Sequence, residues 1–191
     1  MMKKNILQLS LLLLVSLSLS AMDSIGSSVR LINQEVVMSE ISTSSANVSF
    51  RQKQEGRRLD VTVDPAYLSS DWVPHSFTFT PSVSGKVNIE FRGTKNAPEN
   101  LYVAYDSLSA EGAVLRNGSF EDFAPGKPNP KFWWGGFKQE QVIKHSEHAQ
   151  SGSTFVLTRD EQGVRTNMEV TANQPVTISY YVRRVTLAPA K

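Results

Sequence analysis

Apolar and polar residues alternate along most of this chain in short runs that clusters of Gly, Pro, Asn and Ser separate. A period of two is typical of β-strands with one buried face, and no stretch after residue 21 keeps the 3.6-residue period of an amphipathic helix. The pattern predicts an all-β fold, a β-sandwich of two antiparallel sheets. The expected strands are 46–51, 59–64, 76–80, 86–92, 101–108, 141–144, 154–158, 165–171 and 176–185, with one or two more in 29–41.

The same alternation predicts which side chains face the core, because successive residues of a strand point to opposite faces. The expected inward residues are Val48, Phe50, Val61, Val63, Phe77, Phe79, Val87, Ile89, Phe91, Phe155, Leu157, Met168, Val170, Ile178, Tyr180 and Val182. The residues between them are polar: Asn88, Glu90, Arg92, Asn167, Glu169, Thr177, Ser179, Tyr181 and Arg183.

The first 21 residues have the composition of a secretory signal peptide. Lys3 and Lys4 precede a run rich in Leu, and small residues stand at Ser20 and Ala21, where we expect cleavage. The apolar run is shorter than a membrane-spanning helix needs, so we expect no membrane span after removal of the signal. The prediction is a protein that is secreted, periplasmic or exposed on the cell surface.

The balance of charges and the absence of cysteine limit which functions the chain could have. The chain has 20 Lys and Arg against 18 Asp and Glu, and removing two signal-peptide lysines leaves 18 against 18. A neutral chain lacks the positive charge on which nucleic-acid binding depends, so no nucleic-acid partner is expected. Because cysteine is absent, the hydrophobic core must hold residues 22–191 together, and their number suits one domain.

Several motifs in the second half resemble one family of sugar-binding domains. They are Leu-Arg-Asn-Gly-Ser-Phe-Glu-Asp at 115–122, Phe-Trp-Trp-Gly-Gly at 132–136, Ser-Gly-Ser-Thr-Phe-Val-Leu at 151–157 and Val-Thr-Ile-Ser-Tyr-Tyr-Val-Arg at 176–183. These segments resemble the first half of carbohydrate-binding modules of families 4, 9 and 22, which have a jelly-roll fold of the galactose-binding-domain-like type. The resemblance implies a jelly-roll β-sandwich that binds a glycan without catalysis.

The order of the segments departs from that family. Residues 72–80, 86–91 and 101–108 resemble the closing half of the modules, although they precede the opening half. We therefore expect a circular permutant in which residues 22–112 are the family's C-terminal half and 113–191 its N-terminal half. The alternative, the tail of one module followed by the head of another, would leave open sheet edges. The Pro-rich and Gly-rich segment 124–130 is expected to be a loop within the domain.

Aromatic residues are the candidate sugar contacts, because apolar C–H faces of sugar rings pack on indole. Adjacent residues of a strand point to opposite faces, so one of Trp133 and Trp134 should be buried, and we expect Trp134 to be the exposed one. The resemblance adds Tyr181 and Arg183 as residues that could line the concave, glycan-binding sheet. Phe132 and Phe137 belong to the same aromatic cluster, whereas Trp72 and Tyr102 are expected in the core.

The resemblance also implies a structural Ca²⁺ site. In the family, the Glu of the Asn-Gly-Ser-Phe-Glu motif and an Asp near the last strand meet at a calcium ion, which corresponds to Glu121 and Asp106 here, with Asn117 nearby. Calcium prefers several oxygen ligands, which two carboxylates and carbonyls of the Ser151–Gly152 turn could supply. The alternative is that Asn117 caps a turn and the acids are solvated.

Other functions find less support in the residues. His145 and His148 have metal-like spacing but precede a Ser-Gly turn and lack an evident third ligand, so we interpret them as surface residues. No nucleophile elbow, cysteine or phosphate-binding loop is present. The hypotheses are a glycan-binding module, an exported structural or protein-interaction β-sandwich without a sugar ligand, and a small glycan hydrolase. The sugar and the oligomeric state are not predicted.

Overall fold

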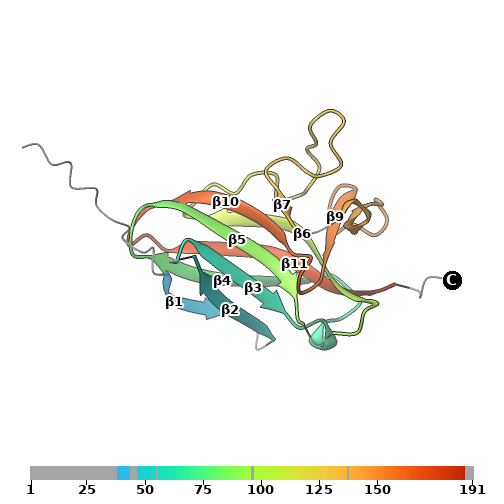
Figure 1. The fold of residues 1–191 in the computed structure, drawn as a ribbon, viewed down its shortest axis with the longest axis horizontal. Helices are drawn as coiled ribbons and strands as arrows, with labels where there is room; N and C mark the ends of the chain where they lie inside the picture. Colours follow the sequence, from blue (N-terminus) through green and yellow to red (C-terminus); the bar gives the residue numbers. More distant parts are fainter. Residues whose placement is uncertain (1–37, 44–46, 55, 96, 137, 188–191) are drawn as a thin grey trace, which may run out of the picture. The chain divides into compact units, whose positions relative to one another are not determined.

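Two β-sheets form the part of the chain that the structure, a computed structural model, describes: residues 38–43, 47–54, 56–95, 97–136 and 138–187. Sheet A has the order β1 (Met38–Thr43), β4 (Val73–Pro81), β11 (Val176–Thr186), β6 (Leu101–Glu111), β9 (Thr154–Thr158) and β8 (Val142–Lys144). Sheet B has the order β2 (Val48–Lys53), β3 (Arg58–Val63), β5 (Gly85–Gly93), β10 (Val164–Val170) and β7 (Trp134–Gly135). Two 3-10 helices are short: η1 (Pro65–Tyr67) and η2 (Gln139–Gln141). Figure 1 shows β2, β3, β5 and β10 side by side.

The predicted β-sandwich class and all nine predicted strands are confirmed, with boundaries shifted by a few residues. β1 begins within the segment 29–41, and β7 was not predicted. One departure concerns strand direction, because β3 and β5 pair in parallel whereas the other strand pairs are antiparallel. The expected signal peptide and Phe137 lie outside the described residues.

Both sheets combine strands from before and after Gly112. In sheet A, β11 lies between β4 and β6, and in sheet B, β10 pairs with β5 and extends the sheet that β2, β3 and β5 begin. The described residues all belong to one compact unit. Two half-sandwiches placed one after the other would not produce this arrangement, because β11 pairs with both β4 and β6 and β10 pairs with β5.

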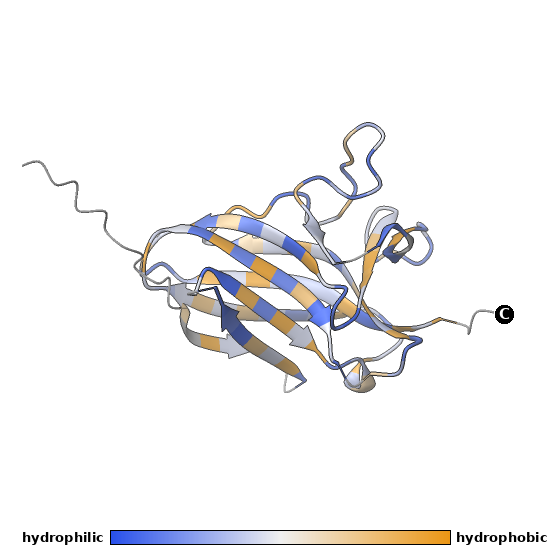
Figure 2. Ribbon diagram, viewed as in Figure 1, coloured by the Kyte–Doolittle hydropathy of each residue, from blue (hydrophilic) through white to orange (hydrophobic). Residues whose placement is uncertain are grey.

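The main core lies between the sheets, and alternation in the sequence produces it. Figure 2 shows the alternation as orange and blue bands along β3 and β5. The outward-facing residues of β2, β3, β5 and β10 are polar, so these strands bury one apolar face in the core. The buried inward residues that confirm the prediction are Val48, Val61, Val63, Phe77, Phe79, Val87, Ile89, Phe91, Met168, Val170, Ile178, Tyr180 and Val182, with Phe50 partly buried.

Strand β9 differs from its prediction. Val156 joins the main core, whereas Phe155 and Leu157, the expected inward residues, belong to a second cluster on the other face of sheet A. Trp72 packs on Phe155 with ring centroids 5.7 Å apart, and its indole N–H donates to His148 O at 3.0 Å. The predicted inward face of β9 was wrong because the β8–β9 loop and Trp72 cover its outer face. Both faces of β9 are therefore buried, and its residues do not alternate between apolar and polar.

Asn117 holds the long loop between β6 and β7. Its side-chain Nδ2 donates to Asp122 O at 3.0 Å and to Lys131 O at 2.9 Å, while its Oδ1 accepts from Asp122 N at 3.0 Å. Its φ of 53° is in the left-handed region, which Asn tolerates better than most residues. Its backbone carbonyl also accepts the indole N–H of Trp133 at 2.7 Å. One residue thus fixes both ends of the loop.

Replacing Asn117 by Ala should therefore destabilise the fold by about 2 kcal/mol, because three side-chain hydrogen bonds are lost and Ala disfavours a positive φ. Asn117→Gly loses the same bonds but accepts the backbone conformation, so it should cost less than Asn117→Ala. The measurement is the free energy of unfolding by chemical denaturation. Equal stability of wild type and Asn117→Ala would show that the amide does not hold the loop.

Candidate functional site

A row of polar and charged residues crosses sheet B on the face opposite the core. Backbone pairing places Trp134 beside Arg165, Arg165 beside Glu90, Glu90 beside Asp60 and Asp60 beside Arg51. Residues paired across neighbouring strands project from the same face. The row therefore brings five strands together at one surface, although its members are far apart in the sequence.

Asp60 contacts three cations and is fully buried, at 0% exposure. Its Oδ1 is 2.6 Å from Arg58 Nε, and its Oδ2 is 2.8 Å from Lys53 Nζ and 3.5 Å from Arg92 Nη2. The aspartate points away from the core, so its burial results from the long cationic side chains that lie over it. A buried carboxylate is stable only with such partners.

Glu90 is the second buried carboxylate of the row. Its Oε2 accepts from Arg165 through Nη2 at 2.7 Å and through Nε at 3.1 Å. Arg58 also pairs with Glu90 through Nη2, so its guanidinium bridges Glu90 and Asp60. Bonds between ionised groups are stronger than those between neutral groups, and the planar guanidinium fixes their direction. The network therefore positions its arginines rigidly.

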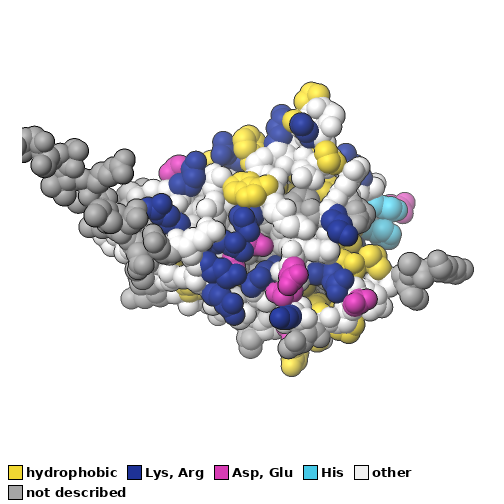
Figure 3. Space-filling view, viewed as in Figure 1, with side chains coloured by type: hydrophobic (Ala, Val, Ile, Leu, Met, Phe, Trp, Pro, Cys, Tyr) yellow, Lys and Arg dark blue, Asp and Glu magenta, His cyan; other side chains and the backbone are white. Residues whose placement is uncertain are grey.

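Cations outnumber carboxylates in this network. We call Lys53, Arg58, Asp60, Glu90, Arg92 and Arg165 the charged face; it has four cations and two acids. A further acid, Asp160, lies 3.4 Å from Arg92 Nη1, which still leaves a positive excess. Figure 3 shows Lys and Arg gathered over the middle of this side of the molecule, with few acids among them.

The pKa of Asp60 reflects the competition between burial and charge. Burial alone raises the pKa of this carboxyl, but the hydrogen bond from Lys53 and the charges of Arg58 and Arg92 outweigh it. The pKa of Asp60 therefore lies below its ordinary value of 3.8. Asp60 is ionised at neutral pH, so it serves as a fixed negative charge among cations.

The two adjacent tryptophans face in opposite directions, as predicted. Trp133 is 4% exposed and packs on Phe120, with ring centroids 4.7 Å apart, whereas Trp134 is 36% exposed. Gly135 allows β7 to approach β10 closely: its φ is 140°, and a Cβ there would lie 2.4 Å from Gly163 O. The close approach places the indole of Trp134 at the edge of the charged face, next to Arg165.

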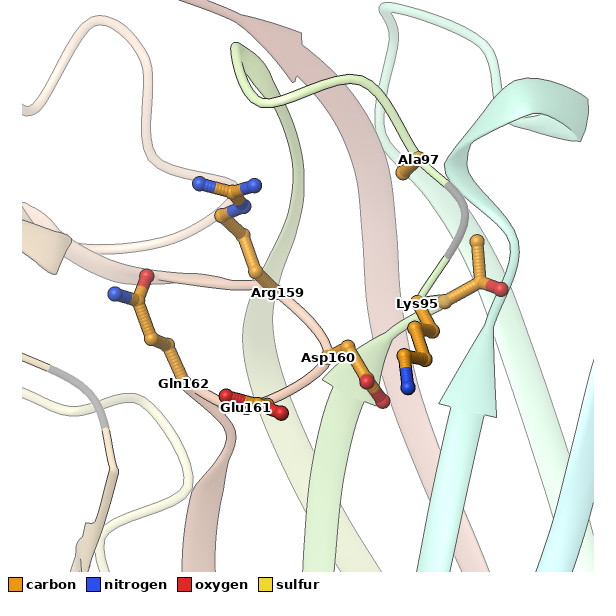
Figure 4. Close-up of a pocket in the computed structure, with 7 residues that line it drawn as sticks. Lys95, Ala97, Arg159, Asp160, Glu161 and Gln162 are labelled. Carbon is orange, nitrogen blue, oxygen red and sulfur yellow. The ribbon is translucent and has the colours of Figure 1, made fainter.

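A pocket of about 320 Å³ lies where the β5–β6 and β9–β10 loops meet. Its lining is mostly polar: Thr94, Lys95, Ala97, Arg159, Asp160, Glu161 and Gln162. Figure 4 shows Arg159 to Gln162 along one side and Lys95 and Ala97 along the other. Asp160 connects the pocket to the charged face through its ion pair with Arg92. The side chains around the pocket supply both hydrogen-bond donors and acceptors.

Tyr181 and Arg183 do not join Trp134. Both are on β11, in sheet A, where Arg183 pairs with Ala104 and packs over Trp72 and Phe155, at 4.8 and 5.2 Å from their ring centroids. The four predicted sugar-binding residues thus occupy three places: Trp133 is in the core, Trp134 borders the charged face, and the other two are on sheet A. Trp72, expected in the core, packs partly buried against the second cluster, as does Tyr102.

Asp106, one of the predicted calcium ligands, anchors the β8–β9 loop. Its carboxylate is buried and accepts from the backbone N–H groups of Ser107 at 2.6 Å, Gln150 at 2.8 Å and Ser151 at 3.1 Å. Burial raises the pKa of Asp106 more than these hydrogen bonds lower it, so the pKa lies above its ordinary value.

Glu121, the second predicted ligand, holds the same loop where it enters β9. It accepts from the backbone N–H groups of Ser153 at 2.6 Å and Thr154 at 2.7 Å and from their hydroxyls at 2.9 and 3.1 Å. Burial raises the pKa of Glu121, but these four bonds lower it below its ordinary value. Glycine suits position 152, because its φ is 62° and a Cβ would lie 2.5 Å from Glu121 Oε1, so another residue would displace this carboxylate.

These contacts do not form a cage for calcium. The ion needs several oxygen ligands, whereas N–H and hydroxyl donors point at the carboxylates of Asp106 and Glu121. Asn117 directs its amide to the β6–β7 loop. Across the described ranges, no group of three or more His, Cys, Asp or Glu side chains could hold a metal ion. These hydrogen bonds account for the positions of Asp106, Glu121 and Asn117 without a bound cation. Calcium binding stays a prediction.

His145 and His148 lie on the β8–β9 loop, and both side chains are exposed, as expected of surface residues. Their rings stack with centroids 4.2 Å apart. His145 N donates to Ser153 O at 2.6 Å, which closes the loop that the two carboxylates hold.

Comparison with known proteins identifies no relative: no family model, curated protein or solved structure matches the chain. Within the part of the chain that the structure describes, no helix is long and apolar enough to cross a membrane.

The sequence did not indicate the charged face as a site. Its acids and arginines alternate with core residues in strands that were predicted correctly, and outward charges of this kind are ordinary for a solvated face. The signal that could have found them is an excess of Arg and Lys at the outward positions of β2, β3, β5 and β10. Which of these positions meet depends on strand order and register.

Replacing Asp60 by Asn should destabilise the fold by about 3 kcal/mol, because three cations lose the buried charge that pairs them. The matched control is Asp122→Asn, which removes an exposed aspartate paired with Lys131 at 2.8 Å and should cost less than about 1 kcal/mol. Chemical denaturation measures both. Equal losses in the two variants would contradict a structural role for the buried network.

Stability should also depend on pH through Asp60. Because its folded-state pKa is below 3.8, its ion pairs stabilise the fold above that pH, and this contribution is lost as the pH falls through the folded-state pKa. The free energy of unfolding should therefore decrease more steeply below about pH 4 in wild type than in Asp60→Asn. Parallel pH profiles of the two proteins would contradict this assignment.

Proposed function

We propose that the protein is a secreted, non-catalytic carbohydrate-binding-like module that holds a glycan by aromatic stacking and hydrogen bonds. The observation that carries the proposal is the exposed indole of Trp134 at the edge of the charged face. An indole offers an apolar surface to the C–H face of a sugar ring, and nearby donors can bind hydroxyl groups. Secretion rests on the composition of residues 1–21.

The groups around Trp134 suit a hydroxyl-rich ligand. Arg165 is next to it on β10, and ion pairs with Glu90 fix its guanidinium. Fixed donors lose little conformational entropy when a ligand binds, which favours affinity. The pocket beyond Arg92 adds amide, carboxylate and ammonium groups that could accommodate a further sugar unit.

The fold supports this proposal through its topology. A circularly permuted jelly roll requires the segments before and after Gly112 to complete the same sheets, and both sheets do contain strands from both segments. We retain the permuted jelly roll as part of the proposal. A fold alone does not determine function, so the argument for glycan binding depends on Trp134 and its neighbours.

A non-catalytic role agrees with the state of the carboxylates on the charged face. Glycoside hydrolysis generally needs one protonated carboxylic acid and a second, ionised carboxylate. Asp60 has a lowered pKa, which is opposite to the requirement for a general acid, and Glu90 is engaged by two arginines. A hydrolase would therefore need other acids.

The second candidate is an exported structural or protein-interaction β-sandwich without a sugar ligand. The observation that favours it is the pairing within the network itself, because both buried carboxylates contact two or more cations. Such a network can serve the stability of sheet B without any ligand.

Affinity electrophoresis in gels containing polysaccharides distinguishes the two candidates. Wild type should be retarded in at least one gel, and Trp134→Ala should lose most of the retardation because the stacking surface is gone. The matched control is Tyr181→Ala, which removes an aromatic ring from sheet A and should migrate like wild type. Release of reducing sugar from the same polysaccharides would indicate a hydrolase instead.

The absence of retardation in neutral and acidic polysaccharides would favour the structural candidate. Retardation that Tyr181→Ala abolishes and Trp134→Ala preserves would move the site to sheet A and contradict the assignment to Trp134.

A further inference from the structure

The charged face has more positive charge than its own acids neutralise, and part of that charge reaches solvent. The side chains of Lys53 and Arg165 are 35% and 25% exposed, whereas the carboxylates of Asp60 and Glu90 lie beneath the cations and are buried. A ligand on this surface thus meets cationic groups first. The two acids hold the cations in place and offer the ligand little negative charge.

The position of the excess charge matters as much as its amount. Without the signal peptide the chain has 18 basic and 18 acidic residues, so a cationic face is a local feature of a neutral protein. From Trp134 to Asp60 the row crosses three strand spacings, about 14 Å. An indole at one end and cations along the rest form a surface of the length of a short oligosaccharide.

We propose that the ligand is an acidic polysaccharide whose sugar units bear carboxylate groups, with one ring stacked on Trp134 and its carboxylates paired with Arg165, Arg58 and Lys53. This inference rests on the proposed glycan-binding function. Guanidinium groups suit the planar carboxylate, which can accept two parallel hydrogen bonds. A neutral glycan would displace water from the excess cations without supplying the opposite charge, so it should bind less tightly.

Two forms of one polymer test the proposal directly: polygalacturonate and its fully methyl-esterified form. They share a sugar backbone, and only the first has free carboxylates. In affinity electrophoresis, polygalacturonate should retard the wild-type protein at least tenfold more strongly than the ester does. The retardation should weaken as salt is raised, because ions screen partly exposed charges.

Two substitutions test whether cations of the charged face cause the preference for free carboxylates. Lys53→Gln should weaken the affinity for polygalacturonate about threefold to tenfold and leave the affinity for the ester the same. Arg165→Gln should weaken the affinity for both polymers, and for polygalacturonate more strongly, because Arg165 also donates to hydroxyl groups. The matched control is Lys127→Gln, which removes one positive charge from an exposed position in the β6–β7 loop and should leave both affinities unchanged. Lys53→Gln leaves Asp60 paired with two arginines, so it should remain folded, and circular dichroism verifies this.

The outcomes separate this inference from the function on which it rests. Equal binding of the polymer and its ester, with Trp134→Ala defective toward both, would overturn the acidic ligand and retain glycan binding. Binding of sulfated dextran without binding of polygalacturonate would overturn the carboxylate assignment. No binding to any polysaccharide would overturn both proposals.

Discussion

The pairing of two buried carboxylates with cations on the outer side of sheet B is the constraint on which the candidate site depends. Asp60 and Glu90 face away from the core, yet they are buried because Lys53, Arg58, Arg92 and Arg165 lie over them. Leaving one carboxylate without its partners would strand a charge at low dielectric. Strands β2, β3, β5 and β10 must therefore keep their register, and that register also brings Trp134 to the end of the row.

The apolar core between the sheets and the loop before β7 hold the strands of the charged face in position. Strands from both halves of the chain build the two sheets over one apolar core, which fixes the orientation of β3, β5 and β10. Asn117 closes the β6–β7 loop and accepts the indole N–H of Trp133, so the buried tryptophan anchors β7 and the next residue is free to face solvent. Asp106 on β6 and Glu121 in the β6–β7 loop hold the β8–β9 loop, which gives both predicted calcium ligands a structural role.

Local alternation made most of the fold predictable, and long-range pairing made the site hard to predict. The nine strands and the opposite facing of Trp133 and Trp134 follow from a period of two, which is a property of neighbouring residues. Phe155 and Leu157 were assigned to the wrong side because a loop covers the outer face of β9. Tyr181 and Arg183 are on a different sheet from Trp134, which the sequence could not indicate because no local pattern tells which sheet a strand joins. The network of Arg58, Glu90 and Arg165 depends on register between strands that are distant in the sequence.

The central claim is that a glycan rests on Trp134, and the three indole N–H resonances of the protein report on it separately. Trp72 donates its indole N–H to His148 O and Trp133 to Asn117 O, whereas Trp134 borders the charged face. The most direct measurement is a nuclear magnetic resonance titration of ¹⁵N-labelled protein with oligogalacturonate. We predict that the Trp134 resonance shifts progressively while the other two stay in place. A shift confined to Trp72, or no shift in any indole signal, would contradict the account.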